Sequence, residues 1–110
     1  MKEKMKQAVL YFKSESVFHE LFVEFRKKYE SLGRIGGTVQ LKGLQKDELE
    51  PLSLFFGKSV KHAISLLAFE KQLQKTKFEG VGLHELLEAY FGEPIRSKKS
   101  VIEEVKLRQD

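Results

Sequence analysis

Two glycine-rich stretches carry the residue types that proteins use to hold phosphate. The first, "SLGRIGGTVQLKGL" (residues 31–44), contains four glycines and one arginine. In phosphate-binding loops the glycines follow a strand and open a helix, so that N–H groups of the helix N-terminus face the phosphate. Here the pattern runs helix, glycines, strand, which favours a tight corner. Its structural glycines are Gly33, Gly36 and Gly37, and Arg34 is the residue in it that could still touch an anion.

The second stretch, "FFGKS" (residues 55–59), ends like a nucleotide-binding Walker loop. That loop needs a glycine at the position held here by Leu52. The preceding residues have the pattern of a helix that Asp47 would cap and that Gly57, a further structural glycine, would end. The end of a helix is therefore favoured over a nucleotide site.

The histidines offer little chemistry. "HELLE" (residues 84–88) has the first half of a zinc-protease motif, but Glu88 stands where the second histidine is required. His84 and Glu88 share a helix face, yet a zinc site needs a third protein ligand, so we expect an exposed i,i+4 pair. His62 shares the apolar face of a predicted strand with Val60 and Ile64, which predicts a hydrogen-bonded core histidine. We predict no catalytic residues, no metal and no cofactor, and expect this chain not to be an enzyme.

Basic residues are the remaining candidates for a binding site. The chain carries a net charge of +4 with a pI near 9.3, which allows an anionic partner without requiring one. Lys71, Lys75 and Lys77 lie on or just past one predicted helix, and two further groups lie near the glycine corner and in a later connector. From these two groups we predict the nucleic-acid-binding residues, which are Arg26, Lys27, Lys28, Arg34, Lys98 and Lys99. Because acidic residues are interspersed, a solvated mixed surface is the alternative.

Hydrophobic periodicity predicts the elements that position these residues. Apolar residues recur at three- and four-residue spacing over 15–32, where Ser14 would cap an amphipathic helix. Further helices are expected at 3–12, 47–56, 66–76 and 83–92, with Leu10 and Leu67 among their inward residues. Alternation predicts two paired strands, at about 38–42 and 60–65. The predicted fold is α+β and mostly helical, with about five to six helices and a small two-stranded sheet.

The predicted domain organisation has two parts. Residues 1–95 form an N-terminal arm domain, and residues 96–110 form a connector and the start of a following segment that is truncated here. The chain has no cysteine, which excludes a disulfide scaffold and a thiolate metal site. We find no signal peptide and no apolar run of the roughly 20 residues needed to span a membrane. We therefore expect a cytoplasmic protein with no membrane partner.

The stretch "FRKKYESLGRIGGTVQLKGLQKDELEPLSLFFG" (residues 25–57) carries a family resemblance. Together with "LHELLEAYFGEPI" (83–95), it resembles the N-terminal domain of a bacterial family long catalogued as conserved hypothetical, a domain of unknown function. That family is similar to the nuclease subunit of type II Wadjet systems, which defend bacteria against plasmids beside an SMC-like motor complex. Arg34 matches the arginine of the family's motif.

The resemblance implies an N-terminal arm joined to a toprim-type domain that holds metal and cuts DNA. The toprim carboxylates are absent from this chain, so we expect a non-catalytic accessory domain. Its implied tasks are to hold double-stranded DNA, to self-associate, or to position the nuclease on SMC-like subunits. The alternative is a protein–protein interaction or dimerisation module with no direct DNA contact. A free-standing DNA binder of the transcription-factor type is a third possibility.

Overall fold

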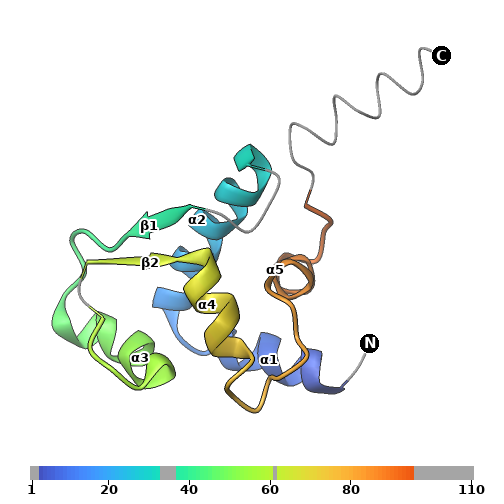
Figure 1. Ribbon diagram of the computed structural model, residues 1–110, viewed down its shortest axis with the longest axis horizontal. Coiled ribbons are helices and arrows are strands. Elements are labelled where there is room, and N and C mark those ends of the chain that lie inside the picture. The colour runs from blue at the N-terminus through green and yellow to red at the C-terminus, as the bar shows by residue number, and fades with distance from the viewer. Residues whose placement is uncertain (1–2, 33–36, 61, 96–110) are drawn as a thin grey trace.

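The computed structural model describes residues 3–32, 37–60 and 62–95. Within them, five helices and a two-stranded antiparallel sheet confirm the predicted mostly helical α+β fold (Figure 1). The elements in chain order are α1 (Glu3–Lys13), α2 (Ser16–Leu32), β1 (Thr38–Gln40), α3 (Lys46–Phe56), β2 (Ala63–Ser65), α4 (Leu66–Leu73) and α5 (Leu83–Phe91). In the described ranges, no helix combines the length and apolar character needed to cross a membrane.

An aromatic cluster forms the centre of the core. Phe12 of α1 lies within 6 Å, centroid to centroid, of rings from α2, α3, α4 and the turn before α5. Those rings belong to Phe18, Phe22, Phe55, Phe69 and Phe78. The apolar stripe of α2 faces this cluster as predicted, and its buried members are Val17, Phe18, Leu21, Phe22, Phe25 and Tyr29. The 3.6-residue period therefore identified the buried face of the longest helix correctly.

The sheet is shorter than the sequence predicted. Its register pairs Val39 with Ile64, and both of these side chains are buried. The Leu41 N–H still donates to the His62 carbonyl at 2.9 Å, although the two residues lie outside the strands. The chain bends at His62, which interrupts the predicted alternation, so the His62 side chain is exposed. The prediction of a core histidine was wrong.

Two leucines that were predicted to face inward are exposed. Leu10 is 70% exposed and Leu67 is 48% exposed. On α1 the buried residues are Ala8 and Phe12, and Leu10 is displaced from Ala8 by about 200° around the helix axis. Leu67 lies about 200° from Phe69 on α4 for the same reason. Apolar side chains alone did not identify the buried face of these short helices.

The observed caps differ in part from the predicted ones. Ser14 does not cap α2, because its hydroxyl donates to the Tyr11 carbonyl at the end of α1. The N-cap of α3 is Gln45 and not Asp47, and the Gln45 N–H donates to Glu48 Oε1 at 3.2 Å. Gly57 ends α3 in the left-handed conformation with φ +71°, as predicted.

The remaining structural glycines have different outcomes. Gly37 has a φ of +89°, a conformation that favours glycine and supports its place in the corner. Gly33 and Gly36 lie outside the described residues. The helix expected at 66–76 ends at Leu73, where the Thr76 hydroxyl donates to the Leu73 carbonyl at 2.8 Å.

We predict that Phe12→Ala lowers the free energy of unfolding by about 3–5 kcal/mol, because it opens a cavity where rings from four other segments meet. Urea denaturation measures this change. Leu54→Ala is the control, since Leu54 is 73% exposed, and should stay within about 0.5 kcal/mol of the parent. Equal effects of the two substitutions would contradict the described core.

Candidate nucleic-acid interface

Arg26, the first of the predicted nucleic-acid-binding residues, connects two helices. Its Nε donates to Glu30 Oε1 at 3.0 Å, and its terminal nitrogen pairs with Glu93, just beyond α5. The guanidinium also lies over the ring of Phe91, 5.3 Å from the centroid. Two carboxylates and an aromatic face thus engage Arg26 inside the domain, which leaves less of its charge for an external phosphate.

The neighbouring lysines of α2 lie on a surface of mixed charge. Lys27 Nζ pairs with Glu24 at 3.2 Å, and Lys28 is half-buried. Glu20 is exposed on the same helix. The other predicted binding residues, Arg34, Lys98 and Lys99, lie outside the described residues, so the structure brings together only the three on α2.

A second group of basic residues lies on α4 and the turn after it. The buried side of α4 consists of Leu66, Phe69 and Leu73. Packing of these three leaves the remaining positions to solvent, and Lys71, Lys75 and Lys77 are all exposed. We call these three lysines the α4 basic strip. The sequence showed them as a basic cluster, but they were not among the predicted binding residues.

Neighbouring contacts fix the far end of the α4 basic strip. Lys77 Nζ lies 5.4 Å from the centroid of Phe78 and 5.8 Å from that of Tyr11. Lys4 of α1 donates to the Glu79 carbonyl at 2.7 Å and brings a further ammonium group to this turn. Lys4 therefore adds a positive charge to the turn that carries Lys77.

The carboxylate on α4 is occupied by contacts with the start of α5 and with Gln74. Glu70 accepts the N–H of Leu83 at the start of α5, where a negative charge suits the helix dipole. It also accepts from the side-chain amide of Gln74. Glu70 is the acidic residue of α4, and these contacts already use its carboxylate inside the domain.

His84 and Glu88 form the exposed pair that their spacing predicts, with Nε2 and Oε2 3.6 Å apart. Glu88 Oε2 also accepts the N–H of Ile95 at 2.9 Å, which ties the chain after α5 to the helix. Among the residues that the structure describes, no three histidine or carboxylate side chains come together as metal ligands. The exposed lysines of the α4 basic strip are the candidate binding site.

The family model described as "Protein of unknown function N-terminus (DUF3323)" matches residues 35–109. This chain belongs to that family. No curated protein and no solved structure matches the chain. The match confirms the predicted resemblance to an N-terminal domain of unknown function. It covers the sheet, α3, α4 and α5, so the α4 basic strip lies inside the part of the chain that defines the DUF3323 family.

Tyr29, which packs 5.1 Å from the ring of His84, makes stability depend on pH. Burial, followed by the nearby charges of Glu70 and Glu85, raises the pKa of Tyr29 to about 12 from the ordinary 10.0. The unfolded chain therefore loses this proton first as pH rises above 10. The contribution of neutral Tyr29 to the free energy of unfolding is fully present below pH 10 and is lost as the pH approaches 12.

We predict that Tyr29→Phe removes much of this alkaline loss, which amounts to about 2–3 kcal/mol. The measurement is the free energy of unfolding from urea curves between pH 9 and pH 12, compared as a difference between variant and parent. Tyr11→Phe is the control, because Tyr11 is less buried and its pKa is raised less. Parallel pH profiles for parent and Tyr29→Phe would contradict the assignment.

Proposed function

We propose that this chain is the non-catalytic N-terminal accessory domain of a DNA-targeting nuclease that defends bacteria against plasmids. In this proposal the domain helps to hold double-stranded DNA and to position the nuclease on an SMC-like complex in the cytoplasm. Two observations support it. The motif over residues 25–57 resembles the nuclease subunit of type II Wadjet systems, and the DUF3323 family is described as a protein N-terminus of unknown function.

The α4 basic strip is the observation that carries the DNA-holding part of the proposal. Phosphate contacts require only lysine or arginine side chains presented on one face, and they read no sequence. Lys71, Lys75 and Lys77 are exposed and lie close together in the chain, on α4 and the turn after it, which supports such contacts. Contacts of this kind would hold duplex DNA of any sequence.

Cleavage is assigned in this proposal to the toprim-type domain that the resemblance implies. Several carboxylates of this chain already have structural partners. Glu48 caps α3, Glu70 holds the start of α5 and Glu88 binds the N–H of Ile95. These contacts give the acidic residues a role in fixing helix ends.

A second candidate is a protein–protein interaction or dimerisation module with no DNA contact. The observation that favours it is the exposure of three leucines on three helices. Leu10 of α1 is 70% exposed, Leu54 of α3 is 73% exposed and Leu67 of α4 is 48% exposed. Exposed apolar side chains of this size are typical of surfaces that meet a partner when they gather in one patch.

We predict that Lys71→Gln/Lys75→Gln weakens duplex binding about tenfold at about 50 mM salt and lowers the salt slope by about 2, because two phosphate contacts are lost. Fluorescence anisotropy of a labelled duplex at about 50 and 200 mM salt measures both quantities. The control is Lys42→Gln/Lys46→Gln, which removes the same charge from two exposed lysines outside the strip.

Two further variants distinguish DNA binding by the α4 basic strip from DNA binding by the residues predicted from the sequence. Lys27→Gln/Lys28→Gln and Arg34→Ala test the helix α2 surface and the glycine corner. Equal losses in the strip variant and its control would show that only net charge matters. No binding by the parent at low salt would contradict direct DNA holding by this domain and favour the interaction module.

A further inference from the structure

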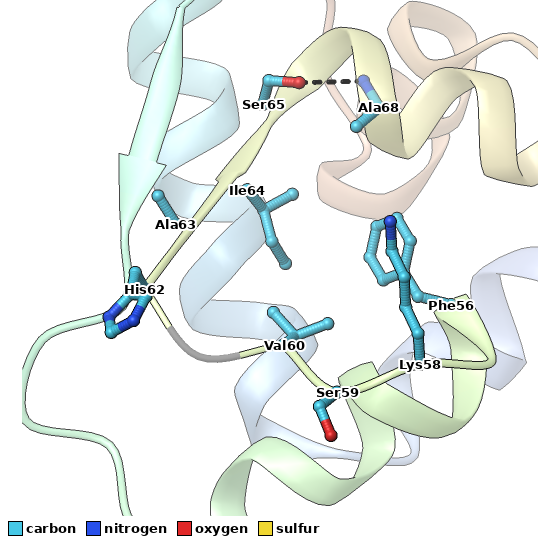
Figure 2. Close-up of a pocket in the computed structure, with 9 residues that line it drawn as sticks. All are labelled: Phe56, Lys58, Ser59, Val60, His62, Ala63, Ile64, Ser65 and Ala68. Carbon is cyan, nitrogen blue, oxygen red and sulfur yellow. Dashed lines mark hydrogen bonds between the residues drawn. The ribbon is translucent and has the colours of Figure 1, made fainter.

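The outer edge of β2 borders an open groove (Figure 2). The groove has a volume of about 530 Å³ and lies between the end of α3 and the β2–α4 segment. Its lining residues are Phe56, Lys58, Ser59, Val60, His62, Ala63, Ile64, Ser65 and Ala68. In Figure 2 the side chains of Phe56, Val60 and Ile64 converge on the same space.

The backbone of β2 presents hydrogen-bonding groups on this edge. The Leu41 N–H bonds the His62 carbonyl, and the Leu66 N–H bonds the Gly37 carbonyl. Bonded and non-bonded pairs alternate in an antiparallel ladder. The paired Val39 and Ile64 therefore direct their backbone groups toward each other, and Ala63 directs its N–H and carbonyl away from β1. Such an edge is a template for another strand.

The side chains around the groove add chemical selectivity. Its apolar lining comes from Phe56, Val60, Ile64 and Ala68, and its ionisable groups are Lys58 and His62. None of the nine lining residues is acidic. An apolar floor beside an ammonium group suits a segment that combines a branched apolar side chain with a carboxylate.

We propose that this groove binds an extended acidic segment of a partner protein, which adds to β2 as a third strand. Main-chain hydrogen bonds to Ala63 would supply affinity, while the apolar floor and Lys58 would select alternate side chains. The inference goes beyond the proposed DNA contact and uses no residue of the α4 basic strip. It gives the domain a means of docking onto a protein while its lysines hold DNA.

Other occupants fit the groove less well. Duplex DNA presents no apolar groups of matching shape at its phosphates, and the lining residues that the structure describes include one lysine, Lys58. A second copy of the chain, paired through β2, would add a second Lys58 and a second His62 to the same small interface. No lining carboxylate offsets that charge. An acidic segment brings negative charge to Lys58 and avoids this repulsion.

The probe is a peptide selected from a random displayed library for binding to the whole chain. The library peptides are about seven residues long, because strands that add to a sheet edge are of this length. We expect enriched peptides to combine Asp or Glu with Val, Ile or Thr. Binding of an enriched peptide is then measured by fluorescence polarisation. We expect Ala63→Pro to weaken it at least about tenfold, because proline removes the outward N–H without removing a bond to β1.

Gln40→Pro is the matched control, because Gln40 occupies the equivalent outward position on β1. It should leave peptide binding unchanged, and Ala63→Pro should leave DNA binding unchanged. Ala68 is exposed, so Ala68→Glu and Ala68→Lys offer variants that do not touch the ladder. Both substitutions place a long side chain in the groove. Ala68→Glu should weaken binding of an acidic peptide more than Ala68→Lys does, because it also adds a negative charge.

Several outcomes would overturn the inference. These are the absence of any enriched peptide, enrichment of basic peptides, and equal binding to parent and Ala63→Pro. Concentration-dependent dimerisation of the parent that Ala63→Pro abolishes would assign the edge to a second copy. Displacement of the peptide by duplex DNA would assign the groove to nucleic acid.

Discussion

The packing of aromatic rings around Phe12 is the contact on which the other features depend. Phe12 brings α1 against Phe22 of α2, Phe55 of α3 and Phe69 of α4, with centroids 5.2 to 5.6 Å apart. Each helix therefore has one orientation that satisfies the core. For α4 this orientation places Phe69 and Leu73 inward, and it leaves Lys71 and Lys75 in water. The candidate DNA surface is a consequence of how the core is filled.

Carboxylates complete this arrangement by joining segments that are distant in the chain. Arg26 links α2 to Glu93, and Glu70 links α4 to the start of α5. These pairs use acidic residues for structure, which leaves the α4 side of the molecule with exposed lysines. The small sheet plays a different part, since the described residues that line the groove beside β2 include no carboxylate. A cationic strip and a strand-accepting edge can therefore serve different partners.

The sequence predicted the parts of the fold that depend on neighbouring residues. The buried stripe of α2, the left-handed end of α3 at Gly57, and the His84–Glu88 pair all follow from short spacings. The failures depend on contacts across the chain. His62 is exposed because the chain bends before β2, and Leu10 is exposed because only one side of α1 meets the aromatic cluster. The partnership of Arg26 with Glu93 and the groove beside β2 both join segments far apart in sequence, and no local spacing signals them.

We propose that this DUF3323 domain holds DNA through the α4 basic strip and leaves catalysis to another domain. The most direct test follows the backbone amides of the isotope-labelled chain by NMR while a short duplex is added at low salt. We expect the largest shifts between Lys71 and Lys77, we expect them to diminish as salt is raised, and we expect the amides of β2 to stay unchanged. Shifts centred on α2 or β2, or no shifts at any salt, would contradict it.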